Sequence, residues 1–343
     1  MRLIRSDRRL VPVILCIDVE PDPRLVSRGT QEPWAGYEQT QRYLEGIRSR
    51  LEARTGSPVR YAWFLRMDPQ IAESYGDPAW AADRYRKHLE NVLRLGDEVG
   101  LHPHPYRWLH QESTWLHDFA NQSWVEHCLR SSMEAFAVSL GRPCLLMRFG
   151  DRWLNTDTVN VAERLGIRLD LTIEPGMPAL PSPMPGELAS GPLPDYRRVP
   201  RTPYPPSRTD FRRPARGYAR TIRMIPLTSS HRRWLWRWPF GVLHRALDNG
   251  LRHWRQDTPL YMSHRWRTPD TFDRMLDRAL AAQRRPYLAF AIRTVVDPDI
   301  FSAVDMCLRA LLDHPAASRF VFCGPASALE LLDRESRSRS AAC

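Results

Sequence analysis

Several features that would place the chain in a specialised class are absent from its sequence. The six cysteines form no CxxC pair and follow no regular spacing, so we expect no disulfide framework and predict a reducing, cytoplasmic compartment. The apolar run near the N-terminus is too short for a membrane span, and acidic residues follow it where a signal peptide would have its cleavage site. We therefore expect this run to be the first core strand.

Lysine is almost absent as well, and arginine supplies the net charge of +11. Lys87 is the single lysine among 50 basic residues. Positions 197–267 hold 17 arginines against three acids, a local balance of +14, so the remainder of the chain carries −3. The basicity therefore belongs to one region. Hydrophobic residues make up 43% of the chain, which is enough for a sizeable core and excludes disorder throughout.

The pattern of apolar runs predicts an α/β protein. Strands are expected at 11–17, 59–65, 98–101, 145–147, 169–173, 223–227, 260–263, 287–292 and 320–323, and helices at 38–52, 80–95, 124–140, 156–165, 271–283, 303–313 and 326–332. This alternation predicts a parallel sheet, open or closed, with an active site at the carboxyl ends of its strands. We place a single barrel domain at 8–333, with a Pro/Arg/Trp-rich insertion at about 177–258 and a disordered tail at 334–343.

Two clusters of chemically reactive side chains follow predicted strands. Asp18 and Glu20 end the first strand, and side chains at positions i and i+2 share a face, so both carboxylates can point at one site. His102 and His104 follow another strand, with a proline holding the backbone between them. A carboxylate with two histidines is the usual ligand set of a catalytic zinc site. The alternatives are helix-capping acids in a solvated loop for the first pair, and an ordinary surface histidine pair for the second.

Four stretches resemble polysaccharide deacetylases of the NodB-homology type, the family-four carbohydrate esterases. CIDVEPD resembles the first motif of that family, GDEVGLHPHP the second, and MRFGDRWLNTDTVNVAERLGIRLDLTIEPG the arginine-bearing third, while FVFCGPASALELL resembles the closing element. The resemblance covers about Val11 to Leu332 apart from the basic region. It implies a distorted (β/α)7 barrel that binds one divalent metal ion, often zinc, and removes an N- or O-acetyl group from a sugar.

The resemblance also implies a role for each matching residue. Asp18 would be the general base, and Arg148 would orient it through an ion pair. The metal ligands would be Glu20, His102 and His104. The metal would polarise the acetyl carbonyl and lower the pKa of a water molecule, and Asp18 would take the proton of that water during its attack.

The sequence departs from the family pattern at three places. Val19 separates two acids that are usually adjacent aspartates, and the histidines are two apart instead of four, with Tyr106 at the later position. The late strand that should end in a catalytic histidine reads LAFAIRTVVD, so Arg293 and Thr294 stand where the general acid is expected. His264 could supply the acid from a neighbouring strand. A chain without such an acid would be a catalytically degenerate, carbohydrate-binding relative in polysaccharide biosynthesis, which is the alternative hypothesis.

Six residues are predicted to contact the substrate. Arg66 and Asp68 lie at a strand end and would line the pocket, although an ordinary surface ion pair is an equal interpretation. Tyr196 and Tyr204 belong to a proline-rich loop that we expect above the barrel mouth, because proline lowers the entropic cost of ordering a loop on a ligand. The predicted set is Arg66, Asp68, Asp151, Tyr196, Tyr204 and Arg293.

The segment 231–240, HRRWLWRWPF, is dense in tryptophan and arginine. Such a segment suits the headgroup layer of a membrane, or it can stack on sugar rings and bind their anionic groups. Nucleic acid and a packed helix with a solvated arginine face are the other interpretations, and no nucleic-acid motif accompanies the segment. The predicted partners are therefore a carbohydrate or lipid-linked sugar and, peripherally, the membrane surface. The sequence does not predict an oligomeric state.

Overall fold

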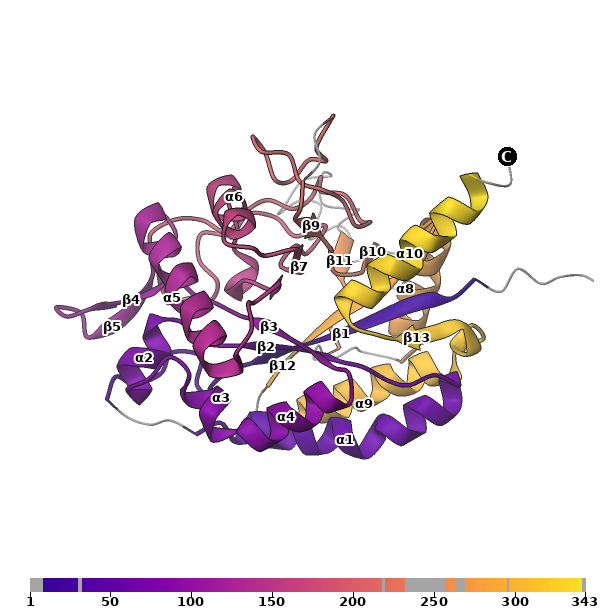
Figure 1. Cartoon of the computed structure of the whole chain (residues 1–343), viewed down its shortest axis with the longest axis horizontal. Helices are drawn as coiled ribbons and strands as arrows, with labels where there is room; N and C mark the ends of the chain where they lie inside the picture. Colours follow the sequence, from indigo (N-terminus) through magenta and orange to yellow (C-terminus); the bar gives the residue numbers. More distant parts are fainter. Residues whose placement is uncertain are drawn as a thin grey trace, which may run out of the picture.

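The computed structural model describes residues 9–29, 33–217, 220–231, 257–262, 269–294 and 296–340. A curled sheet forms its centre, a half-barrel with helices packed around it (Figure 1). The strand order is β12-β1-β2-β3-β6-β7-β9, β13 also pairs with β1, and each of these pairings is parallel. The bounds are β1 (Val11–Val19), β2 (Ala62–Leu65), β3 (Glu98–Leu101), β6 (Leu146–Met147), β7 (Leu169–Asp170), β9 (Arg223–Met224), β12 (Leu288–Arg293) and β13 (Phe320–Phe322).

β1 is apolar along almost its whole length because both faces of the sheet are covered. All nine of its residues are buried. Val13, Leu15 and Ile17 pack into the large core beneath the outer helices, whereas Ile14 and Cys16 pack into a second core lined by the other strands and α10 (Pro325–Ser340). Side chains alternate between faces along a strand, so the even-numbered residues of β1 point into the half-barrel.

Helices cover the outer face of the sheet (Figure 1). The structure places α1 and α9 side by side there, and the core side chains of both belong to the large core. Gly141 ends α5 in the left-handed conformation with a φ of 65°, as expected of a glycine directly after a helix. The helices are α1 (Ala35–Thr55), α2 (Pro69–Tyr75), α3 (Trp80–Arg84), α4 (Arg86–Arg94), α5 (Gln122–Leu140), α6 (Thr156–Arg164), α8 (Pro269–Ala282), α9 (Pro298–Asp313) and α10.

Two small sheets lie beside the central one. β4 (Tyr106–Leu109) and β5 (Thr114–His117) form an antiparallel hairpin, and β8 (Leu188–Ala189) adds a third strand to it. β10 (Ser229–His231) pairs with β11 (Asp257–Pro259). The hairpin follows directly after the two predicted metal-binding histidines, so it brings further side chains to the same end of the sheet.

The predicted parallel α/β architecture is confirmed, and three details of the prediction are wrong. The helix expected at 80–95 is two helices, because Tyr85 between them has a non-helical φ of −109°. The strand expected at 260–263 lies earlier, as β11. The tail expected to be disordered from Arg334 continues α10 as far as Ser340, since it holds no proline or glycine and Arg334 pairs with Glu330 one turn earlier.

The predicted insertion at about 177–258 is only partly an insertion. The residues from 177 to 217 are almost entirely irregular, as expected, but β9 lies within the predicted range and joins the central sheet. The domain limits at 8 and 333 stay a prediction. Residues 232–256, which hold most of the tryptophan- and arginine-rich segment, lie outside the described residues.

The structure bears on the expectations about disulfides and about membrane-spanning segments. Five of the six cysteines lie in the described ranges; all five are buried, and no disulfide joins any two of them. No helix in the part of the chain that the structure describes has the length and apolarity needed to cross a membrane.

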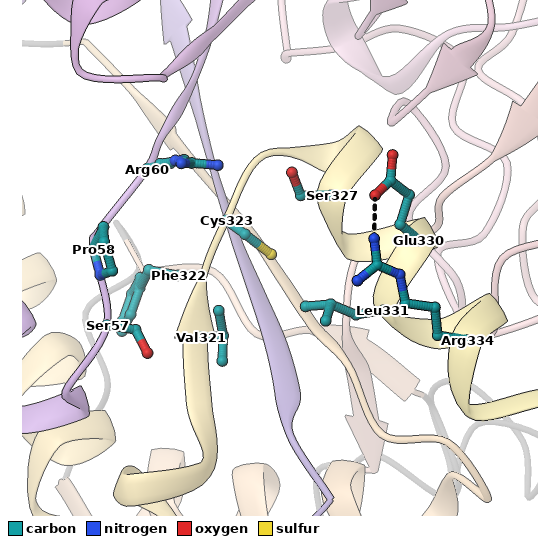
Figure 2. A pocket seen from close by; sticks show the side chains of 10 residues that line it. All are labelled: Ser57, Pro58, Arg60, Val321, Phe322, Cys323, Ser327, Glu330, Leu331 and Arg334. Atoms are coloured by element: carbon teal, nitrogen blue, oxygen red, sulfur yellow. Dashed lines mark hydrogen bonds and ion pairs between the residues drawn. The ribbon is translucent and has the colours of Figure 1, made fainter. Parts of the chain in front are cut away.

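A cavity of about 280 Å³ opens between the loop before β2 and the start of α10 (Figure 2). Arg60, Cys323 and Glu330 are among its lining residues, and none of the residues predicted to carry chemistry reaches it. Burial raises the pKa of the Cys323 thiol to about 12, so this cavity offers no thiolate nucleophile. The predicted metal ligands lie instead at the carboxyl ends of the strands.

His88 makes the stability of the fold dependent on pH. Its ring lies against Tyr37 and Trp63 in the core, and both ring nitrogens lack a hydrogen-bond partner in the structure. Burial lowers the pKa of His88 to about 4, and the opposing effect of Glu45 is smaller. Because the folded pKa lies below the unfolded value, full stability is present above about pH 6.5 and is lost as the pH falls towards 4.

As the pH falls from about 6.5 to 4, we expect His88 to lower the free energy of unfolding in urea by up to about 1.4 kcal/mol per pH unit, against the opposite contribution of buried Asp170, whose pKa burial raises to about 7. His88→Gln should lower the absolute stability and flatten this slope. His127→Gln, at an exposed position of α5, is the matched control and should keep the wild-type slope. Equal slopes for both variants would show that His88 is not the titrating group.

Candidate metal centre

The candidate site forms because the inward-facing positions of neighbouring strands turn polar at the same end of the sheet. The alternation that points Ile14 and Cys16 into the half-barrel also points Asp18 and Glu20 there. His102 and His104 follow β3, which is separated from β1 by β2 alone. Since all of these strands are parallel, their carboxyl ends meet at one edge, and the two predicted clusters come together there.

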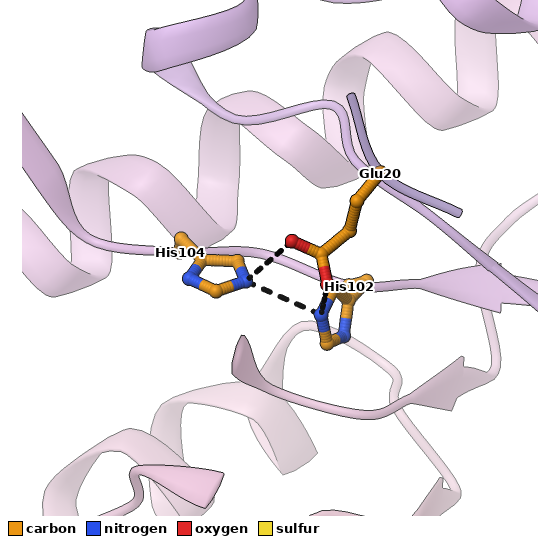
Figure 3. A group of neighbouring side chains, drawn as sticks. All are labelled: Glu20, His102 and His104. Atoms are coloured by element: carbon orange, nitrogen blue, oxygen red, sulfur yellow. Dashed lines mark hydrogen bonds and ion pairs between the residues drawn. The ribbon is translucent and has the colours of Figure 1, made fainter. Parts of the chain in front are cut away.

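Glu20, His102 and His104 converge on one point (Figure 3). One ligand atom from each side chain lies within 4.8 Å of the other two, and all three residues are buried. The Nε2 atoms of the two histidines are 3.2 Å apart. Glu20 Oε1 lies 3.4 Å from His102 Nε2, and Glu20 Oε2 lies 3.8 Å from His104 Nε2. Glu20 Oε2 is buried and has no hydrogen-bond partner in the structure.

The outer nitrogens of both histidines are held by oxygen acceptors. His102 Nδ1 lies 2.6 Å from the carbonyl oxygen of Arg148, and His104 Nδ1 lies 3.2 Å from Asp151 Oδ2. An oxygen acceptor requires the proton on Nδ1, so each neutral ring presents the bare lone pair of Nε2 to the centre. With both rings in this tautomer, two lone pairs and a carboxylate face one another. This donor set fits a divalent cation.

Burial and neighbouring charges shift the pKa values of the three candidate ligands in different directions. Burial would raise the pKa of Glu20, but Arg293 and then His102 outweigh it and hold that pKa well below its usual range. Burial lowers the pKa of His104 to about 4. Burial also acts to lower the pKa of His102, but Asp18 and Glu20 outweigh it and raise that pKa. Glu20 is thus anionic and His104 neutral at pH 7, as metal binding requires.

Arg66 and Asp68 support the metal ligands and do not contact the substrate. Both side chains are completely buried, which rules out the expected pocket lining as well as the surface ion pair. Arg66 Nη1 lies 3.7 Å from Glu20 Oε2, while its Nε and Nη2 donate to the carboxylate of Asp68. Asp68 Oδ2 also accepts from the backbone N–H of His104 at 3.1 Å. The pair therefore fixes Glu20 and the backbone of His104 from behind.

Arg148 lies against Asp18, where the predicted orienting role would place it, and the role itself stays a prediction. Its Nε donates to both carboxylate oxygens of Asp18, at 3.0 and 3.1 Å. Its other nitrogens donate to the carbonyl oxygen of Leu171 and to Glu174 Oε1, so the guanidinium cannot swing away. Tyr261 in turn donates its hydroxyl to Glu174. The sequence analysis missed Glu174, although it lies within the third motif, and Tyr261.

Asp151 is the second charged support of the centre, and its carboxylate is not available to a substrate. Its Oδ2 contacts His104 Nδ1 at 3.2 Å and His117 Nδ1 at 3.1 Å, and its Oδ1 pairs with Arg24. Glu187 closes a ring, because it pairs with both Arg24 and His117, at 2.8 and 2.9 Å. The sequence did not predict these roles for Arg24, His117 and Glu187: Arg24 follows β1, His117 ends β5, and Glu187 directly precedes β8.

Arg293 and Thr294 stand at the end of β12, directly beside Asp18 in the strand register. Arg293 Nε lies 3.2 Å from Glu20 Oε1, and the side chain is 29% exposed, the most exposed of the four arginines around the centre. Thr294 is buried; its hydroxyl accepts from the backbone N–H of Glu20, so it holds the strand end in place. His264, the other predicted general acid, lies outside the described residues.

Tyr196 and Tyr204 do not face the site. Both belong to the hydrophobic core, at 0% and 4% exposure. Tyr196 donates its hydroxyl to the carbonyl oxygen of Arg152, and Tyr204 donates to that of Phe211. The prediction that these rings contact a substrate is therefore wrong for this structure. Tyr196 ties its loop to the connection after β6, whereas Tyr204 joins two parts of its own segment.

The ion pairs around the centre form one network with an excess of negative charge. Six carboxylates and four guanidiniums take part, so with neutral histidines the described network carries two net negative charges, which one divalent cation would balance. The acids are Asp18, Glu20, Asp68, Asp151, Glu174 and Glu187, and the bases are Arg24, Arg66, Arg148 and Arg293, with His102, His104 and His117 between them.

Comparison with known proteins identifies the fold. No protein-family profile matches the chain, and no curated protein sequence is similar to it. A solved structure from Mycobacterium smegmatis, described as a polysaccharide deacetylase, is 13% identical, with a TM-score of 0.52 over 96% of this chain and 93% of its own. The chain has the polysaccharide-deacetylase fold. The predicted fold class is thereby confirmed.

This deacetylase fold does not by itself specify the substrate. The structure of PuuE allantoinase is similar to the same extent, with 11% identity and a TM-score of 0.51 over 95% of this chain and 91% of its own. Two structures with different names for their activities therefore share the fold. Function has to be argued from the side chains of the site.

Gly150 makes room for His104 in this deacetylase fold. A Cβ atom at position 150 would lie 2.2 Å from His104 Nε2, the atom that faces the metal site. Gly150→Ala should therefore displace the ring and weaken zinc binding by about 10- to 100-fold, with a stability cost of about 1–3 kcal/mol. Isothermal titration with zinc and urea unfolding measure the two effects.

Gly46→Ala is the matched control for this substitution. Gly46 lies at an exposed position inside α1, and a Cβ atom there would meet nothing within 4 Å. It should leave zinc binding unchanged and stabilise the helix by about 1 kcal/mol. Unchanged zinc affinity in Gly150→Ala would mean that His104 Nε2 is not a ligand.

Proposed function

We propose that the chain is a metal-dependent hydrolase that removes an acetyl or related acyl group from a carbohydrate. The observation that carries the proposal is the convergence of Glu20, His102 and His104, whose ligand atoms lie within 4.8 Å of one another while the outer nitrogens of both rings contact oxygen acceptors. Asp18 lies next to this centre, 3.7 Å from His102 Nδ1, and is a candidate base. The fold supports the same reaction class, because the neighbour from M. smegmatis is described as a polysaccharide deacetylase.

Zinc is the proposed ion, because one carboxylate and two imidazole nitrogens leave a coordination position open, as in catalytic zinc sites. Glu20 and the Nε2 atoms of His102 and His104 would hold it. When bound, the ion would polarise the acyl carbonyl and make a water molecule more acidic.

The protein groups of the reaction follow from their positions. Asp18 would accept the proton of the attacking water on a carboxylate oxygen. Arg148 would fix the orientation of Asp18 through two contacts from Nε, at 3.0 and 3.1 Å. Glu174 and the carbonyl oxygen of Leu171 fix Arg148 in turn, so the base is held at one position before substrate arrives.

Among the described residues we identify no side chain that can donate a proton to the leaving group. Arg293 carries a permanent charge and cannot give up a proton, but its partly exposed guanidinium can stabilise negative charge that develops beside Glu20. His264 remains the proposed proton donor. The second candidate function, a carbohydrate-binding relative without turnover, is favoured by this same arginine at the end of β12.

The biological setting follows from the earlier predictions and remains a proposal. The substrate would be a polysaccharide precursor or lipid-linked sugar, handled in the cytoplasm. Contact with the inner membrane surface would run through segment 231–240.

Metal binding separates a metal centre from a chance cluster. Purified protein dialysed against zinc should retain about one ion per chain, measured by mass spectrometry of the metal, and His102→Ala and His104→Ala should each reduce this to near zero. His127→Ala, on the exposed side of α5, should bind as the wild type does. Wild-type protein that takes up no divalent ion would remove the basis of the proposal.

Acetate release separates the hydrolase from the binding protein. Asp18→Asn should keep its zinc and lose about 10²- to 10⁴-fold in the rate of acetate release from acetylated amino-sugar oligomers. Asp305→Asn, on the surface of α9, changes the same functional group far from the site and should keep full activity. A zinc-loaded wild type that binds these oligomers without releasing acetate would favour the non-catalytic candidate.

A further inference from the structure

A basic surface, which we call the arginine rim, lies on the irregular segment 195–216. The segment contains two acids, Asp195 and Asp210, and both are engaged by arginines of the same segment. Arg213 is 81% exposed at its side chain and Arg208 is 60% exposed. The exposed arginines of the rim are Arg197, Arg198, Arg208, Arg212, Arg213 and Arg216.

One part of the arginine rim is anchored near the metal centre, and from there the rim runs along α6 to Glu163 in the last turn of that helix. Tyr196 donates its hydroxyl to the carbonyl oxygen of Arg152, the residue after Asp151. The backbone N–H of Phe211 donates to the hydroxyl of Thr156, in the first turn of α6. Both anchor points lie in the connection that follows β6, at the carboxyl ends of the strands. The rim is therefore fixed to the same connection that supplies Asp151 to the centre.

The positive charge of the rim is only partly neutralised. Asp195 pairs with Arg197, and Asp210 pairs with two further arginines. Glu163 of α6 is shared by Arg208 and the buried Arg220. The six exposed arginines of the rim and the buried Arg220 therefore meet three carboxylates, a balance of +4. Within the described residues, Arg198 and Arg216 have no acidic partner.

The rim is also suited to bind without a large entropic cost. Prolines recur through it and limit its conformational freedom, and its large hydrophobic side chains are buried anchors. The guanidinium group matches the geometry of carboxylate and phosphate, with two parallel hydrogen bonds. A membrane-inserting surface would also need exposed apolar side chains, and the described rim has no large one. A hydrated anionic polymer fits these properties better than a lipid interface.

We propose that the arginine rim binds an anionic carbohydrate polymer that carries carboxylate or phosphate groups, and that the metal centre acts on one residue of such a polymer. This inference rests on the proposed function for the identity of the reaction, but the binding itself does not. The polymer would lie across the rim with one sugar at the centre. Neighbouring anionic sugars would then contact the arginines.

The experiment measures binding of polygalacturonate, a carboxylated glycan, to the whole protein, with neutral dextran of the same length as reference. Wild-type protein should bind polygalacturonate and not dextran, and its affinity should fall steeply between about 50 and 200 mM salt. The triple variant Arg198→Gln, Arg213→Gln, Arg216→Gln should bind at least about tenfold more weakly and with a shallower salt dependence.

The matched control removes the same charge from other surfaces. The variant Arg94→Gln, Arg130→Gln, Arg309→Gln changes exposed arginines of α4, α5 and α9, and it should bind polygalacturonate as the wild type does. Zinc content should be unchanged in both variants, which separates loss of rim binding from loss of the fold or of the metal centre.

Three results would overturn the inference. The first is no binding of polygalacturonate at low salt, and the second is equal weakening in the two triple variants. The third is rim-dependent binding that is tighter to phosphatidylglycerol vesicles or to single-stranded DNA than to the glycan. If the protein binds the glycan through the rim but holds no zinc, the proposed hydrolase function is contradicted and the proposed role of the rim is supported.

Discussion

The placement of buried charge at the carboxyl ends of a parallel sheet is the constraint on which the rest of this structure depends. A carboxylate taken out of water is costly unless a cation or hydrogen-bond donors surround it. Asp18 and Glu20 are both nearly buried, and each has an arginine against it. Arg148 is also held by Glu174, and Arg66, the second arginine near Glu20, is held by Asp68. The network extends outwards until it reaches partly exposed residues such as Arg24.

The network fixes the three donors in position as well as in charge. Arg66 and Asp68 lie behind Glu20 and the backbone of His104, and Asp151 holds the far nitrogen of the same ring. Asp151 adopts a left-handed backbone conformation with a φ of 54°, which costs about 1–2 kcal/mol for a residue other than glycine. Its contacts with two histidines and an arginine offset that cost. The contacts within the centre therefore stabilise an otherwise unfavourable backbone conformation at this turn.

The sequence predicts the centre well because the strands that carry it alternate strictly. The inward positions of β1 lead to Asp18 and Glu20, those of β3 lead to His102 and His104, and the arginine of β6 follows the same rule. The alternation of side chains between the two faces applies only within the strands. It says nothing about Glu187, which reaches the centre from an irregular segment.

Loops explain the errors as well. The prolines around Tyr196 and Tyr204 suggested a rigid loop over the site. The two tyrosine rings are large apolar groups, however, and both are buried in the core, where they anchor that segment. Arg66 and Asp68 were expected to line the pocket or to form a surface ion pair, because nothing in their local sequence shows that the strand β2 that they follow lies between β1 and β3.

The pairing of β1 with the last strands has a consequence for how the chain reaches its fold. β1 begins at Val11, yet its partners include β12 and β13, which end at Arg293 and Phe322. The first strand therefore stays without these neighbours until nearly the whole chain has been synthesised, and closing such long loops slows folding. During synthesis its unbroken apolar run is exposed to aggregation, so cells that make this protein have to protect the nascent chain until the sheet closes.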